Sequence, residues 1–217
     1  MRKVNKRDEI PTQFLEPKQA QRRIENFNKR TIKRNVQKDM KKLNDWVHSL
    51  NGKNVDTEKF LSRIYAVADL YMQEEVYPRS VCAKGCAHCC TGILVEATAI
   101  EISYIEAKAD IDLDINWSAK SSVGSNRPTE TEHCSLLDAR TATCKAYKPR
   151  PLQCRLFSSF DHYELCEDPL GEHYTHRASS SPFWNLMLGN VALASHQAAA
   201  ERDITAVADM RDWIAQK

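Results

Sequence analysis

The sequence has few glycines, no glycine-rich loop and no long run of apolar residues. Six Gly and eight Pro in 217 residues argue against low complexity or wholesale disorder. Neither a phosphate-binding loop nor a dinucleotide-binding turn is found, which argues against the common nucleotide-binding enzymes. No Ser, His and Asp stand in an order that indicates a hydrolase triad.

The beginning of the chain lacks the features of an exported protein. The stretch MRKVNKRDEIPTQF is basic, but no apolar segment follows it, so it does not have the form of a secretory signal. The longest weakly polar run, TGILVEATAI, contains Glu96 and is far shorter than a membrane span. We therefore expect a soluble, cytoplasmic protein with no membrane partner. Thiols stay reduced in the cytosol, so we do not expect structural disulfides.

Charge is divided unevenly along the chain. Residues 1–50 contain 14 Lys or Arg and 6 Asp or Glu, a net charge of +8, whereas the other 167 residues carry −6. A basic helix can bind nucleic acid or a protein, but it is more often a solvated face, and no known reading motif accompanies it. The candidate contacts are Arg22, Arg23, Lys29, Arg30, Lys33 and Arg34.

Two apolar stripes at helical spacing follow the basic segment. The first runs from Ile32 to Leu50 in steps of three and four residues, and the NG after it is a C-terminal stop. The second lies between Asp56 and Pro78 and consists of Phe60, Ile64, Val67 and Tyr71. The short connection NGKNVD predicts an antiparallel helical hairpin. We expect residues 1–78 to form a basic helical arm and this hairpin.

All eight cysteines lie in the second part of the chain. The block CAKGCAHCC contains Cys82, Cys86, Cys89 and Cys90, and the spaced set is Cys134, Cys144, Cys154 and Cys166. Thiolates gathered that closely repel one another unless a cation neutralises them, so the spacing itself predicts a metal. Thiolates suit zinc and iron–sulfur clusters. Eight thiols allow two four-sulfur sites, or one site with reserve ligands, and the spacing does not choose between them.

Residues 79–217 are expected to form a cysteine-cluster metal-binding domain with C-terminal helices. Between the cysteine blocks, TAIE is a capping box that opens a helix through Ile102 and Ile105, and residues 110–133 are expected to be a flexible loop. Ser181 and Pro182 begin a buried helix. A last amphipathic helix is predicted from Ile204, Val207, Ala208 and Ile214. The fold class is therefore mostly α, with the hairpin and C-terminal helices around an irregular cysteine-rich core.

Two segments, CAKGCAHCC and CSLLDARTATCKAYKPRPLQCRLF, together resemble the YkgJ-type cysteine-cluster family, whose domain is described as zinc- or iron-chelating. The family pattern is CxxxCxxCC, then Cys, a short hairpin-like segment, Cys-x-x-Tyr, and Arg-Pro-x-x-Cys-Arg with a following aromatic. The resemblance covers residues 80 to about 160 and leaves out Cys166. It implies that zinc or iron, including an iron–sulfur cluster, is bound by Cys82, Cys86, Cys89, Cys90, Cys134, Cys144 and Cys154.

Other side chains stand beside these cysteines. Arg150 and Arg155 flank Cys154, where positive charge favours the thiolate, although pairing of Arg150 with a surface carboxylate is equally expected. We expect Tyr147 and Phe157 to pack around the site. Two histidines adjacent to cysteines could each replace a sulfur as a zinc ligand, but such residues are more often outer or exposed; they are His88 and His133.

The type of function stays open at this point. Cys82, Cys86 and Cys89 have the spacing of the radical S-adenosylmethionine motif, but we find no strand–helix barrel of the kind that this chemistry needs. Some relatives with similar cysteine blocks are linked to protein lysine methylation. The alternatives to a simple metal-chelating protein are an iron–sulfur enzyme, with redox or methyl-transfer chemistry, and a nucleic-acid-binding module.

Overall fold

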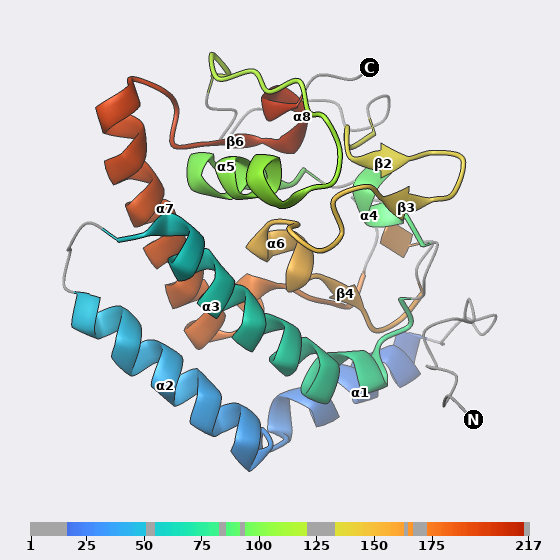
Figure 1. Ribbon diagram of the computed structural model, residues 1–217. Helices are drawn as coiled ribbons and strands as arrows, with labels where there is room; N and C mark the ends of the chain where they lie inside the picture. Colours follow the sequence, from blue (N-terminus) through green and yellow to red (C-terminus); the bar gives the residue numbers. More distant parts are fainter. Residues whose placement is uncertain are drawn as a thin grey trace, which may run out of the picture.

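The computed structural model describes residues 17–50, 55–82, 86–91, 94–120, 133–162, 165–166 and 173–214. Helices make up 60% of these residues and the strands are short, which confirms the expected mostly α fold (Figure 1). The longer helices are α1 (Pro17–Lys29), α2 (Arg34–Leu50), α3 (Thr57–Tyr71), α5 (Ala99–Lys108) and α7 (Pro182–Arg202). The short ones are α4 (His88–Thr91), α6 (Leu152–Arg155) and α8 (Met210–Trp213).

The strands form antiparallel pairs. They are β1 (Glu96–Thr98) with β6 (Val207–Asp209), β2 (Leu137–Asp138) with β3 (Thr143–Cys144), and β4 (Ser158–Ser159) with β5 (Thr175–His176). The hairpin-like segment expected between Cys134 and Cys144 is thus present as β2 and β3. None of the helices that the structure describes combines the length and the apolarity needed to cross a membrane.

Helices α2 and α3 form the antiparallel hairpin that the apolar stripes predicted (Figure 1). The buried residues of α2 are Val36, Met40, Leu43 and Val47, which are the central positions of the first stripe. The Asp56 side chain accepts a hydrogen bond of 3.1 Å from the backbone N–H of Lys59 and so caps the start of α3. Residues 51–54, which include the predicted NG stop, lie outside the described residues.

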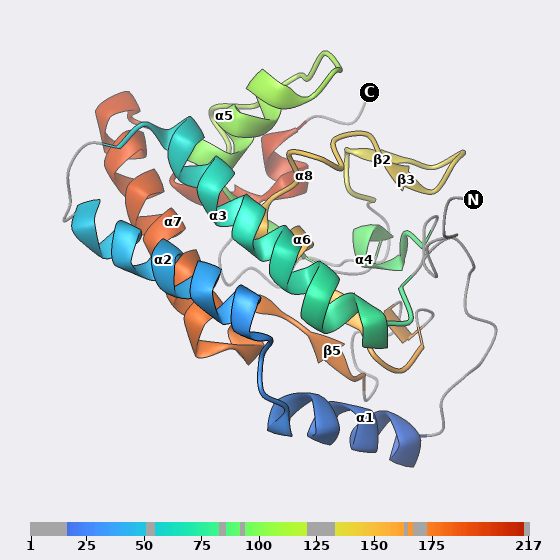
Figure 2. The same ribbon diagram turned by 60° about the horizontal axis from the view of Figure 1, so that its bottom comes forward.

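The basic arm is held to the end of the hairpin by a buried carboxylate. After α3 the chain continues as a π-helix, Met72–Val76, in which Glu75 is 1% exposed. Its carboxylate accepts hydrogen bonds from Nε of Arg30 (2.9 Å) and from the backbone N–H of Lys33 (2.7 Å). Helix α1 therefore does not continue α2 but lies across its base, beside β5 (Figure 2).

The predicted last amphipathic helix is wrong for most of its length. Residues 207–209 form β6, in which Ala208 lies opposite Ala97 of β1 and both are fully buried, and only Met210–Trp213 is helical. Short apolar runs do not distinguish a strand from a helix by their spacing, because the partner strand supplies the decisive hydrogen bonds. The start of α7 at Ser181 and Pro182 is confirmed.

The capping box at the start of α5 is confirmed, and its carboxylate reaches further than the motif requires. One oxygen of Glu101 accepts hydrogen bonds from the backbone N–H (3.0 Å) and the hydroxyl (2.9 Å) of Thr98. The other accepts from the Tyr65 hydroxyl (3.0 Å) and from the backbone N–H of Leu152 (2.8 Å). One buried carboxylate thus ties α5 and α3 to the first residue of α6, the helix that contains Cys154.

The apolar core consists of two clusters. The larger joins α2, α3 and α7 with Leu152 and Leu156, and the smaller joins α5, β1, β6 and α8 with residues of the β2–β3 hairpin. Part of the predicted loop 110–133 also packs on the smaller cluster, since Ile115 forms a β-bridge with Ile214. The larger cluster includes residues on both sides of position 78; the division into 1–78 and 79–217 stays a prediction.

Candidate metal centre

The eight cysteines come from several short segments, and none of them is paired in a disulfide. Cys82 follows the 3-10 turn Tyr77–Arg79, and the next three cysteines lie at or just before α4, which Figure 1 shows beside β2 and β3. A backbone hydrogen bond joins the two cysteine blocks, because the N–H of Cys134 donates to the carbonyl oxygen of Cys90 at 2.8 Å. The remaining positions are Cys144 in β3, Cys154 in α6, and Cys166.

Four of these thiols act on one another, and we call them the first thiol group: Cys90, Cys134, Cys144 and Cys154. Burial raises the pKa of Cys154 well above its usual range, and charge on any of the other three raises it further. Burial, followed by charge on Cys90 and then on Cys144, raises the pKa of Cys134 to about 12. Burial and then Cys90 also raise the pKa of Cys144. Charge on one member therefore opposes the ionisation of the others, whereas a hydrogen bond with Cys89 lowers the pKa of Cys90.

A second thiol group consists of Cys82, Cys86 and Cys166. A hydrogen bond with Cys86 lowers the pKa of Cys82, against the effect of burial, and Sγ of Cys82 also accepts a bond of 3.2 Å from the backbone N–H of Ser159. The pKa of Cys86 is raised by the same bond, then by burial, and also by charge on Cys166. Cys89 bonds to Cys90, and charge on Cys154 and on Cys82 raises its pKa, so it lies between the two groups.

The kind and number of donors fit zinc or iron. Thiolates are the preferred ligands of zinc and of iron–sulfur clusters, and a cation would offset the repulsion that raises these pKa values. In the part of the chain that the structure describes, no three Cys, His, Asp or Glu side chains lie close enough together to hold one ion. The fit is therefore one of donor chemistry and proximity, without a closed coordination shell.

The two arginines beside Cys154 have different roles. Arg155 binds both oxygens of Asp69, at 2.8 and 2.7 Å, and its Nε donates to the carbonyl oxygen of Arg150. Arg150 lies 3.9 Å from the same carboxylate and lowers the pKa of Cys154, but burial outweighs it. The pairing expected for Arg150 is present as this long contact, the closer pairing belongs to Arg155, for which none was predicted, and positive charge does not by itself produce a thiolate.

Of the aromatic and histidine neighbours, Tyr147 differs from expectation. Packing of Tyr147 around the site is wrong, because its side chain is 54% exposed, with the guanidinium of Arg150 3.9 Å from the ring centroid. Phe157 is partly buried and has Arg177 over its ring. His88 begins α4 and His133 directly precedes Cys134; a role of either as a ligand stays a prediction.

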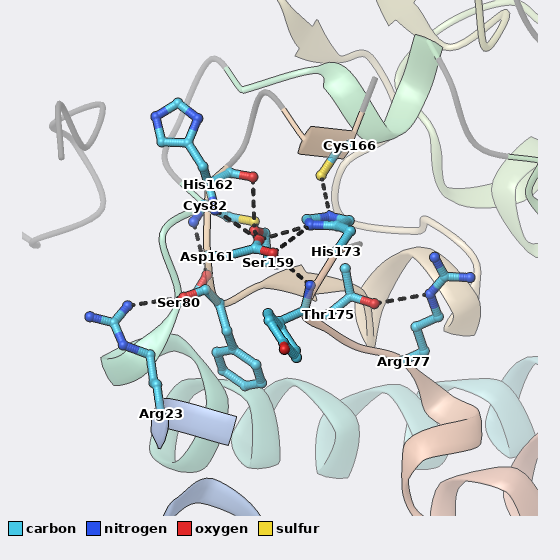
Figure 3. Close-up of polar contacts among 12 residues, drawn as sticks. Arg23, Ser80, Cys82, Ser159, Asp161, His162, Cys166, His173, Thr175 and Arg177 are labelled. Carbon is cyan, nitrogen blue, oxygen red and sulfur yellow. Dashed lines mark hydrogen bonds and ion pairs between the residues drawn. The ribbon is translucent and has the colours of Figure 1, made fainter. Parts of the chain in front are cut away.

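A polar network around β4 and β5 was not foreseen from the sequence (Figure 3). Oδ2 of Asp161 accepts hydrogen bonds from Nδ1 of His173 (3.0 Å) and from the backbone N–H of Tyr174 (2.6 Å). Nε2 of the same histidine lies 3.1 Å from Sγ of Cys166. Burial raises the pKa of Asp161, but hydrogen bonds from its neighbours outweigh it and hold the pKa below its usual value. The strands that bring these residues together are two residues long, so the sequence shows no alternating pattern from which they could be predicted.

The candidate nucleic-acid contacts are only partly available. Arg23 donates to the carbonyl oxygens of Arg79 and Phe160, and Arg30 and Lys33 pair with Glu75 and Glu74. The exposed members of the set are Arg22, Lys29, Lys33 and Arg34, and among these Lys33 is the one paired with Glu74. Half of the expected basic surface thus holds α1 and α2 in place.

Comparison with known proteins finds one family model that matches the cysteine region. Residues 81–177 match the model of the CxxCxxCC family, described as "Putative zinc- or iron-chelating domain". The match confirms the resemblance seen in the sequence and extends it beyond Cys166 and His173. No curated protein and no solved structure matches the chain.

Proposed function

We propose, from the premise that residues 81–177 carry the CxxCxxCC domain, that the protein holds zinc or iron through its cysteine thiolates. The first thiol group carries the proposal, because its four sulfur atoms come from distant segments and each opposes the ionisation of the others. Burial raises the pKa values of Cys134, Cys144 and Cys154, so a bound cation must displace their protons, and metal affinity will fall as the pH falls.

The metal's role in this proposal is to join segments that secondary structure holds only weakly. A four-thiolate zinc site has no open position and is typically structural. The ligands proposed are the seven cysteines expected from the sequence, together with Cys166. They suffice for two ions, or for an iron–sulfur cluster with thiols to spare. Redox or methyl-transfer chemistry is not supported by any contact among the described residues.

The decisive experiment is anaerobic purification, followed by elemental analysis and an absorption spectrum. We expect at least one tightly held zinc or iron per chain; iron would show thiolate-to-metal absorption in the visible range and zinc would not. Cys154→Ser should lower metal content and the melting temperature together. Ile64→Val, which removes one buried methylene from α3, is the matched control and should lower the melting temperature alone. Metal-free wild-type protein, or unchanged metal content in Cys154→Ser, would overturn the proposal.

We propose that the protein lies in the cytoplasm, where thiols stay reduced and so are available to bind a metal. Rapid alkylation of thiols during cell lysis should label cysteines that metal does not protect. Recovery of the protein with intramolecular disulfides would contradict this location.

A further inference from the structure

We propose that His173 supplies a nitrogen ligand to a second metal site, whose sulfur ligands come from the second thiol group. Asp161 acts in this site as a positioning residue that holds the imidazole ring. The inference deepens the proposed function and rests on it, since it names the residues of a site distinct from the first thiol group.

The histidine faces a thiol on one side and a carboxylate on the other. Its Nε2 lies 3.1 Å from Sγ of Cys166, and its Nδ1 lies 3.0 Å from Oδ2 of Asp161 (Figure 3). The side chains of His173 and Asp161 are 9% and 3% exposed, and Cys166 is 4% exposed. The thiol, the imidazole and the carboxylate thus form a continuous row of polar groups within the protein.

The carboxylate of Asp161 is held in place by hydrogen bonds from groups other than the imidazole. Oδ1 of Asp161 accepts hydrogen bonds from the Ser159 hydroxyl (2.8 Å) and the backbone N–H of His162 (2.7 Å), and Oδ2 accepts from the backbone N–H of Tyr174 (2.6 Å). An acceptor at Nδ1 keeps the proton on that nitrogen and leaves the lone pair of Nε2 for a metal. Metal-binding histidines are commonly oriented by a carboxylate in this way.

Ser159 connects the histidine to the other sulfurs of the group. Its backbone N–H donates to Sγ of Cys82 at 3.2 Å, while its hydroxyl donates to Asp161. Cys82 is in turn hydrogen-bonded to Cys86. One strand residue thus fixes a sulfur and the carboxylate that orients the imidazole. Three thiolates and one imidazole are a common ligand set of zinc. No three of the described side chains lie close enough together to hold one ion, so the metal itself must draw these four ligands together when it binds.

A second histidine, His176, lies three positions after His173 and has a purely structural role. Both ring nitrogens of His176 are committed within the core, Nδ1 to the carbonyl oxygen of Leu156 (2.7 Å) and Nε2 to the Tyr71 hydroxyl (3.1 Å). In His173 the second nitrogen meets a thiol of the cluster instead. Cys166 is buried beside another thiol, which suits a ligand rather than a nucleophile that must meet a substrate.

The test uses Co²⁺ as a spectroscopic probe of the full chain, reconstituted anaerobically after chelation. Thiolates give intense charge-transfer absorption, and a nitrogen ligand shifts the visible bands to shorter wavelength than sulfur does. We expect His173→Cys to keep the second ion while moving its bands to longer wavelength and increasing the charge-transfer intensity. His173→Ala should lower the affinity for the second ion. Asp161→Asn should lower the affinity for the second ion about 10- to 100-fold without moving the absorption bands.

Two control variants separate ligation from stability. His196→Ala changes an exposed histidine of α7 and should leave the spectrum and affinity as in the wild type. His176→Gln should lower the melting temperature but not shift the bands.

The outcomes distinguish this inference from the proposed function. Wild-type protein that takes up no Co²⁺ would overturn both. Normal uptake with identical bands in wild type and His173→Cys would overturn only the role of His173. The latter result, joined to slower alkylation of Cys166 in metal-free His173→Ala, would assign the histidine to thiol activation instead.

Discussion

The helical hairpin and the cysteine region are built in opposite ways. In α2 and α3, apolar residues repeat along two helical faces and are buried against each other over several turns. Between residues 133 and 176, the described strands are two residues long and α6 has four residues, so regular backbone hydrogen bonding is sparse. Single polar contacts, such as those of Glu101 and Asp161, fix this region instead.

The difference shows where each region obtains its stability. Many small apolar contacts hold the hairpin, and no one of them decides its shape. In the cysteine region a few buried polar groups and, as we propose, a metal determine where each short element lies. The two regions should therefore respond differently to metal removal, to loss of apolar volume, to pH and to changes of surface charge.

Metal removal should have the largest effect and should be confined to one region. Apparent binding free energies of structural zinc sites are about 10 kcal/mol or more, and the short elements have little else to join them. After chelation we expect backbone amides of residues 133–162 to lose protection from hydrogen exchange, while those of α2 and α3 keep it. Equal loss in both regions, or no loss in either, would contradict the comparison.

Loss of apolar volume should destabilise the helical hairpin and leave metal binding in the cysteine region unchanged. Leu61 is fully buried in α3, and Leu61→Ala should cost about 3 kcal/mol of unfolding free energy while leaving the metal content unchanged. Leu193→Ala in α7, where the side chain is 58% exposed, is the control and should change the unfolding free energy by less than about 0.5 kcal/mol. Denaturant unfolding and elemental analysis measure the two effects. Loss of metal in Leu61→Ala would show that the regions are not separable in this way.

Acid should weaken the contact between the two regions through His176. Burial lowers the pKa of this histidine to about 4, below its unfolded value of about 6.5. Its neutral form therefore contributes stability fully above pH 6.5, and this contribution is lost as the pH falls towards 4. The unfolding free energy of the wild type should fall relative to that of His176→Gln by about 2 kcal/mol between pH 7 and pH 5. A pH-independent difference between the two proteins would mean that His176 is not buried in its neutral form.

Removal of one charge should loosen the junction between the hairpin and α6. In Glu101→Gln one buried oxygen becomes an amide nitrogen, which cannot accept the hydrogen bonds that Glu101 now accepts. We expect a loss of about 1–3 kcal/mol in unfolding free energy and a smaller loss of metal affinity. Glu106→Gln, on the exposed side of the same helix, should be neutral in both measurements. Equal effects of the two substitutions would show that Glu101 does not position α6.

The smallest effect on stability is expected on the basic surface. Arg22, Lys29 and Arg34 are exposed, so their joint replacement by Glu should change the unfolding free energy by less than about 0.5 kcal/mol per site. If the arm binds nucleic acid, the wild type will bind tightly at low salt, the affinity will fall steeply as salt rises, and the triple variant will not bind. Absence of wild-type binding at low salt would leave a solvated face or a protein-docking helix.

Pattern and structure agree wherever a local rule decides the outcome. The hairpin, the Asp56 cap, the capping box at Thr98 and the start of α7 all depend on residues within about four positions of one another. The last predicted helix fails because β6 forms only when β1, more than 100 residues earlier, lies beside it. The network of Asp161 and His173 was missed for the same reason.

The sequence by itself determined that this protein is mostly helical and that its chemistry belongs to its thiols, because helical periodicity and close cysteine spacing are local properties. Only the tertiary structure decided how the thiols divide into groups, that Arg30 between α1 and α2 pairs with the buried carboxylate of Glu75, and which histidine meets a cysteine. These outcomes depend on contacts between segments far apart in the chain. In such contacts burial and individual hydrogen bonds set the free energy, and neither leaves a pattern in neighbouring residues.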